Sequence, residues 1–145
     1  MLNIRRNVFE TNSSSSHSIS ICSDSNSTDK LYVDDDGIVK LPGGEFGWEY
    51  EEYYYAAAKA DYCAVWAVQY GSEEDQEMLK KVICEHTGAK EVVFDFQIDE
   101  CGKDNWSYID HQSSDVAVDV FASEEDLKNF IFNTGSVLIT DNDNH

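Results

Sequence analysis

A run of hydroxyl side chains ends in a histidine near the start of the chain. Asn12 is followed by four consecutive serines and then by His17. In a turn, serine hydroxyls and successive backbone N–H groups can cradle an anion. A histidine with an unperturbed pKa near ~6.5 can accept or donate a proton there. The simpler interpretation is a polar connection whose side chains cap its own backbone.

An anion site at this turn would need positive charge and a second polar segment. Arg5 and Arg6 supply the charge upstream, and Asp110 and His111 lie on a polar loop, 99–114, that would have to fold back. The sequence has no Gly-x-Ser-x-Gly elbow and no Gly-rich phosphate loop, so no catalytic residue is assigned. The candidate anion-binding residues are Arg6, Asn12, Ser13, Ser14, Ser15, Ser16, His17 and His111.

The net charge is the second feature that points to function. The chain has 29 Asp and Glu residues against 10 Lys and Arg residues, for a formal net charge of -19. Such a chain repels nucleic acid and anionic membrane surfaces, and it attracts basic proteins. The expected partner is therefore a basic protein, with no direct nucleic-acid or membrane contact. No cofactor is expected, and the oligomeric state stays open.

Two clusters of carboxylates lie where helices are expected to start. Carboxylates three or four residues apart on a helix lie ~5–6 Å from each other, a spacing comparable to that of neighbouring phosphates on a DNA strand. Such rows would attract the nucleic-acid groove of a basic protein. The alternative is the ordinary preference of helix starts for acidic residues on a solvated face. The candidate partner-binding residues are Glu45, Glu49, Glu52, Glu73, Asp75 and Glu77.

Four segments carry a resemblance to known proteins. Residues 6–18, Arg-Asn-Val-Phe-Glu-Thr-Asn-Ser-Ser-Ser-Ser-His-Ser, resemble the opening of small proteins encoded by phages and by bacteria with phage-like elements. Residues 108–111, 130–133 and 141–144 are similar to later segments of that group. The resemblance implies a phage-related origin and names no activity. With the charge, it favours an inhibitor of a basic host or defence protein that mimics nucleic-acid charge. The alternative is a nucleotide- or phosphate-binding protein or transferase.

Composition predicts a single folded domain. The 145 residues, 41% of them hydrophobic, suffice for one core, with a polar tail at 141–145. No apolar run approaches the ~18 residues of a membrane helix, and the first residues lack a signal core, so the expected location is the cytoplasm, that of the host cell for a phage protein. The four cysteines lack a Cys-x-x-Cys pair and are expected to be free thiols. No metal site is expected from the histidines.

Apolar patterning predicts an α+β fold in which a mostly antiparallel sheet packs against a long central helix and two shorter helices. Residues 48–70 lack Gly and Pro, so a long helix should begin near Trp48 with its aromatic stripe in the core, although an exposed binding face is the alternative. Ser72-x-x-Asp75 and Ser123-x-x-Asp126 predict the caps of the shorter helices.

Strands are expected near both ends and in the middle of the chain. Period-two patterning of apolar residues predicts strands within 17–22 and 91–98. A short edge strand is expected within 1–9, and a final strand at 136–140 after Gly135. Residues 30–41 should form a hairpin, because Asp-Gly separates two apolar runs. The triple Asp before that Gly lacks the ligand spacing of a calcium loop. Residues 116–121 are expected to be a strand or an extended connection. The strand order does not follow from the sequence.

Overall fold

A four-stranded antiparallel sheet forms one side of the molecule. The computed structural model describes residues 4–9, 15–22, 28–46, 50–98, 107–109 and 116–142. The sheet has the order β1-β2-β8-β5, with β1 at Ile4–Phe9, β2 at Ser15–Cys22, β8 at Val137–Asn142 and β5 at Glu51–Tyr53. The predicted edge strand and the period-two strand are confirmed. Strand β8 extends two residues into the predicted tail.

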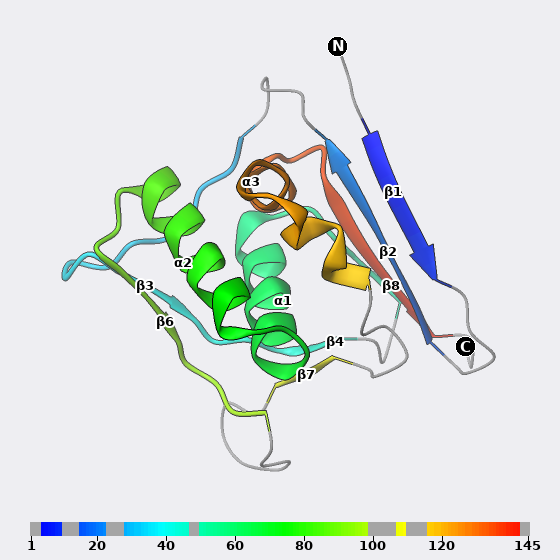
Figure 1. Ribbon diagram of the computed structural model, residues 1–145, viewed down its shortest axis with the longest axis horizontal. Coiled ribbons are helices and arrows are strands. Elements are labelled where there is room, and N and C mark those ends of the chain that lie inside the picture. The colour runs from blue at the N-terminus through cyan, green and yellow to red at the C-terminus, as the bar shows by residue number, and fades with distance from the viewer. Residues whose placement is uncertain are drawn as a thin grey trace.

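Three helices lie between this sheet and a small parallel pair of strands (Figure 1). Helix α1 spans Ala56–Gln69, α2 spans Glu73–Thr87 and α3 spans Glu124–Phe132. The parallel pair joins β3, Ile38–Leu41, to β6, Glu91–Phe94. A second parallel pair joins β4, Glu45–Phe46, to β7, Tyr108–Ile109. The α+β class with a mostly antiparallel sheet is confirmed.

Helix α1 is the buried centre of the fold, as predicted. Tyr62 and Val65 are fully buried and Trp66 nearly so, while Tyr54, Tyr55 and Val68 are exposed, so only part of the predicted aromatic stripe lies in the core. The predicted start near Trp48 is wrong, because residues 51–53 pair with β8 as an edge strand. In this segment, Tyr53 is half-buried and pairs with Leu138 of β8, and an aromatic side chain suits such a pleated, half-buried surface. The helix is consequently one residue shorter than α2.

The start of α1 is capped from a distant part of the chain. The backbone N–H of Ala56 donates to the carboxylate of Asp29 at 2.8 Å, while Tyr55, the residue at the cap position, contributes no side-chain bond. This hydrogen bond is the main reason that the pKa of Asp29 lies below its usual range. The helix therefore begins where an acceptor 27 residues away can satisfy its first free N–H groups.

The two outer helices begin as predicted. Ser72 and Asp75 form a reciprocal capping box at α2, and Gly88 ends that helix in the left-handed region at φ 80°. Ser123 accepts a hydrogen bond from the backbone N–H of Asp126 at α3. The expected apolar face of α3 is confirmed, since its core-facing residues are fully buried: Leu127, Phe130 and Ile131.

Two local predictions are wrong. The Asp34–Gly37 turn forms, with Asp34 Oδ1 accepting from the N–H groups of Asp36 and Ile38, but the chain after it pairs in parallel with β6 and makes no hairpin. Residues 116–121 form short 3₁₀ turns, η2 at Val116–Val118 and η3 at Val120–Ala122. Ala117 and Val120 are buried three residues apart, which matches the three-residue period of a 3₁₀ turn.

A buried lysine fastens α1 to the C-terminal part of the chain. The ammonium of Lys59 donates to the carbonyl oxygens of Asn133 at 2.8 Å and Ser136 at 2.9 Å, in the turn between α3 and β8. Its side chain is fully buried, and its Nζ lies 5.8 Å from the centre of the Phe130 ring. Burial lowers the pKa of Lys59 to about 8, and nearby Cys63, Asp29 and Cys22 oppose that shift.

Candidate partner-binding surface

Part of the serine-histidine stretch belongs to a strand. Ser15, Ser16 and His17 belong to β2, so the prediction of a turn that continues to His17 is wrong. His17 pairs with Phe9 of β1 on one side and with Thr140 of β8 on the other. A residue flanked by two strands has its backbone N–H in the ladder, which removes it from an anion cradle.

Of the remaining candidate anion-binding residues, only Arg6 lies in the described part of the chain. Arg6 lies in β1, opposite Ser20 of β2. Asn12, Ser13, Ser14, Asp110 and His111 lie outside the described residues. The strand before His111 is held to the end of α1, because the Gln69 side chain donates to the carbonyl of Ile109 at 3.0 Å and accepts from its N–H at 2.8 Å. The Tyr70 hydroxyl donates to the same carbonyl at 2.8 Å.

The first predicted acidic row is not on a helix. Glu45 lies in β4 and Glu52 in β5, while Glu49 is outside the described residues. The expected helical spacing between Glu45 and Glu52 is therefore wrong, because both residues lie in strands. Glu52 accepts hydrogen bonds from the hydroxyls of Tyr50, at 2.6 Å, and Tyr54, and these bonds hold its pKa below the usual range.

The second predicted acidic row does lie on a helix. Glu73, Asp75 and Glu77 occupy the first turns of α2, where they complement the positive end of the helix dipole. Asp75 is used by the fold, since its carboxylate accepts from the Ser72 N–H at 3.0 Å. Glu73 and Glu77 are exposed and lie four residues apart on one face. The structure therefore assigns Asp75 to capping and leaves Glu73 and Glu77 at the surface.

Helices α2 and α3 together present a larger acidic surface than the sequence predicts. We define the acidic face as the exposed carboxylates of Glu74, Glu77 and Glu85 on one side of α2 and of Glu124 and Glu125 at the start of α3. An ion pair between Lys81 and Glu124, at 3.0 Å, links the two helices across this face. Positions 74, 77, 81 and 85 recur at helical spacing, so their side chains share one side of α2.

A hollow of about 450 Å³ opens within the acidic face, between α2 and α3. Glu85, Glu124 and Glu125 line it together with Val82, His86 and Lys128. The His86 ring stacks on Phe132 with centroids 3.8 Å apart, and burial lowers the pKa of His86. A histidine with a lowered pKa is mostly neutral at pH 7, so it adds little positive charge beside the carboxylates.

The charge balance of this face is negative. Five carboxylates oppose two lysines, Lys81 and Lys128. Hydrogen bonding to Glu124 raises the pKa of Lys81, which keeps that lysine charged and engaged. Sequence reasoning missed Glu85, Glu124 and Glu125 because they join Glu77 only through the packing of two helices distant in the chain. The run Ser-Glu-Glu-Asp at 123–126 is the local signal that could have drawn attention to the α3 start.

Comparisons with known proteins give no match for this chain. No family model, no curated protein and no solved structure matches it. Within the described ranges, no group of three or more His, Cys, Asp or Glu side chains is arranged to hold a metal ion. In the same part of the chain, no helix is long and apolar enough to cross a membrane.

Proposed function

We propose that this protein is an acidic, phage-type inhibitor that binds a basic host or defence nucleic-acid-binding protein. The observation that carries the proposal is the acidic face, where two packed helices present five exposed carboxylates, three of which, Glu85, Glu124 and Glu125, line a hollow. The resemblance of residues 6–18 to phage-encoded proteins supports a host or defence protein as the partner. The net charge of -19 supports the sign of the interaction.

Two physical arguments connect the acidic face with a nucleic-acid groove. Glu74 and Glu77, three residues apart on α2, hold two carboxylates ~5–6 Å from each other, a spacing that lysines and arginines of such a groove can meet, and Lys81 separates this pair from Glu85. The hollow between α2 and α3 adds room for a long basic side chain among three carboxylates. Long-range attraction then accelerates the encounter in the same way that DNA attracts its binding proteins.

The test is a comparison of two charge variants with equal net charge. In the face variant, Gln replaces all five glutamates of the acidic face. In the control variant, five other exposed carboxylates become Asn or Gln: Asp35, Asp36, Glu51, Glu91 and Asp95. Wild type and both variants are immobilised, and proteins are captured from a bacterial lysate at about 50 mM and about 300 mM salt.

The expected result is selective capture of one or more basic nucleic-acid-binding proteins by the wild type and the control variant at low salt. Capture should fall steeply at high salt because exposed charge pairs are screened. The face variant should lose it, and added duplex DNA should compete with the wild type for the captured protein. Equal capture by the two variants would show that net charge alone, and no particular surface, attracts the partner, and would refute the assignment to α2 and α3.

A further inference from the structure

A second, smaller hollow lies between the first half of α1 and β3. Its volume is about 210 Å³, below the ~300–1,000 Å³ of pockets for drug-sized ligands. Buried apolar residues form part of its wall: Leu31, Val39 and Leu41. We call it the Asp61 hollow, because the carboxylate of Asp61, on α1, is one of its lining groups. Its size suits one long side chain of a partner.

Asp61 is an under-paired carboxylate. The backbone N–H of Gly43 donates to its Oδ1 at 3.2 Å, and the described residues provide no hydrogen bond to its other oxygen. Burial raises the pKa of Asp61 to about 7, and the hydrogen bond from Gly43 only partly opposes this shift. The ionised form of a buried, poorly compensated carboxylate is strongly stabilised when a cation supplies the missing partner.

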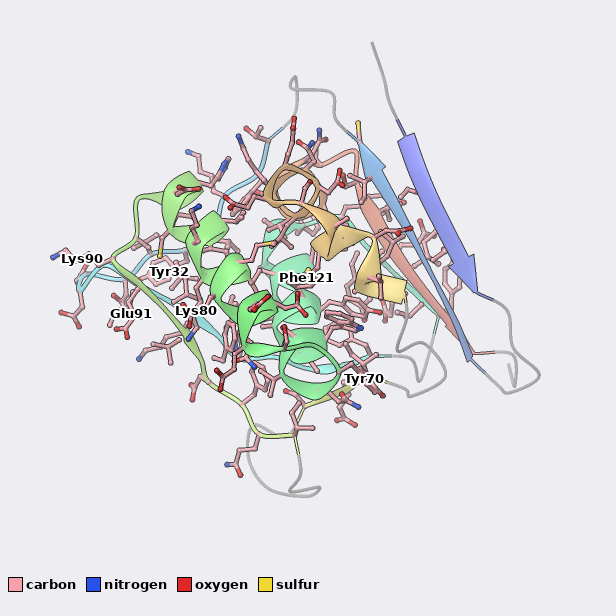
Figure 2. All side chains as sticks on the ribbon, in the orientation of Figure 1. Tyr32, Tyr70, Lys80, Lys90, Glu91 and Phe121 are labelled. Atoms are coloured by element: carbon pink, nitrogen blue, oxygen red, sulfur yellow. The ribbon has the colours of Figure 1, made fainter. Side chains whose placement is uncertain are left out.

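The rim of the Asp61 hollow carries three other titratable groups. Tyr32 is 80% exposed, which leaves its ring face open for stacking, and Figure 2 shows it at the end of the molecule where Lys90 and Glu91 lie. Asp34 adds a second carboxylate, although its Oδ1 already accepts two backbone N–H groups of the turn. Lys40 lines the rim too, but its side chain is exposed and its ammonium can remain in solvent.

We propose that the Asp61 hollow binds the side chain of a single arginine of the basic partner. The apolar wall holds the aliphatic stem, the Asp61 carboxylate accepts hydrogen bonds from the guanidinium, and the Tyr32 ring stacks on it. Arginine fits better than lysine because its planar head makes paired hydrogen bonds with a carboxylate and stacks on aromatic rings. The identity of the partner rests on the proposed function, whereas the site itself can be tested without the partner.

The chemistry of Asp61 makes the binding depend on pH. The guanidinium favours the ionised carboxylate, so occupation of the hollow lowers the pKa of Asp61 and releases the proton that this group holds below pH 7. Affinity should therefore rise as the pH increases from 6 to 8.

The experiment uses the full chain and a defined arginine compound. Isotope-labelled protein is titrated with N-acetyl-arginine-methylamide, and NMR follows the backbone amides of Ile38, Gly43 and Ala57. N-acetyl-citrulline-methylamide, which has nearly the same shape without the charge, is the ligand control. Asp61→Asn tests the carboxylate, and Asp95→Asn, at an exposed carboxylate outside the hollow, is the protein control.

The expected result is a saturable shift of these amides with the arginine compound, several-fold tighter at pH 8 than at pH 6. Asp61→Asn should weaken binding at least about tenfold with an unchanged amide spectrum elsewhere, and Asp95→Asn should not weaken it. Equal binding of the citrulline compound, or undiminished binding to Asp61→Asn, would overturn the site. If the wild type captures basic proteins without binding this compound, the proposed arginine site at Asp61 is refuted and the proposed function is not. If it binds the compound but captures no such protein, the proposed function fails alone.

Discussion

Two charged side chains lie two residues apart on α1 and meet opposite surroundings. The ammonium of Lys59 is fully buried and donates to two carbonyl oxygens within 2.9 Å. The carboxylate of Asp61 is half-buried beside a hollow, with one hydrogen bond of 3.2 Å. Burial shifts the pKa of both groups toward neutrality, to about 8 and about 7. Both pKa shifts have the same cause, so the role of each group must be inferred from its hydrogen-bond partners.

The difference teaches how to interpret a perturbed pKa in this fold. A shifted pKa marks candidate functional groups, but structural networks shift pKa values as well. The ammonium of Lys59 donates to two backbone carbonyl oxygens, and its side chain is fully buried. Asp61 has a free acceptor oxygen within the described residues and room beside it. We therefore assign Lys59 to stability and Asp61 to binding, and substitutions at each position can break that assignment.

The largest expected effect is the loss of stability in Lys59→Ala. The substitution removes the buried stem and leaves a cavity, and it removes the donor that two carbonyls share. We expect a decrease of about 3–5 kcal/mol in the free energy of unfolding, measured by chemical denaturation. Lys40→Ala, at an exposed position, is the control and should change the midpoint little. A loss below about 1 kcal/mol for Lys59→Ala would contradict the structural role.

A smaller loss is expected for Asp29→Ala, which removes the distant cap of α1. The cap at Ala56 is worth about 1–2 kcal/mol, and Asp29→Asn should retain part of it because the amide oxygen still accepts. The pKa of Asp29 is lowered in the folded chain, so the ionised cap contributes fully above the unfolded pKa of ~3.9 and is lost as the pH falls through the folded value. The difference between wild type and Asp29→Ala should therefore shrink at pH 3. A constant difference would point to packing instead.

The position of Asp29 also shows where sequence reasoning stops. The caps of α2 and α3 lie within three residues of the helix starts, and the sequence predicts both correctly. The start of α1 depends on Asp29 and on the pairing of residues 51–53 with β8, which are contacts between distant parts of the chain. The predicted hairpin failed for the same reason, because the Asp34–Gly37 turn is local but the partner of β3 is β6.

The candidate sites divide along the same line. The acidic start of α2 was predictable from helix-start preferences, while the acidic face required the packing of α3 beside it. Asp61 left one signal that the sequence analysis did not use. Lys59 and Asp61 are the charged residues of the otherwise apolar or aromatic stretch 56–68. Charged groups are rarely buried without a partner, so their presence in a helix predicted to be central already required an explanation.

The last effect is of similar size and gives the sharpest test of the comparison: the pH dependence of stability in Asp61→Asn. The folded chain holds a proton on Asp61 up to about pH 7, whereas the unfolded chain releases it near ~3.9. Between these values the folded state binds more protons, so the free energy of unfolding contributed by this group falls as the pH rises. Asparagine cannot ionise and avoids this loss.

The Asp61→Asn variant should match wild type near pH 4 and exceed its free energy of unfolding by about 1–2 kcal/mol at pH 8, after allowance for the solvent that still reaches the side chain. Denaturation curves at intervals of pH, with Asp95→Asn as the exposed control, give the difference directly. A stabilised variant that no longer binds the arginine compound would show that Asp61 costs the fold stability for the sake of binding, whereas parallel pH curves would place Asp61 with the ordinary surface carboxylates and leave Lys59 as the perturbed charge of α1.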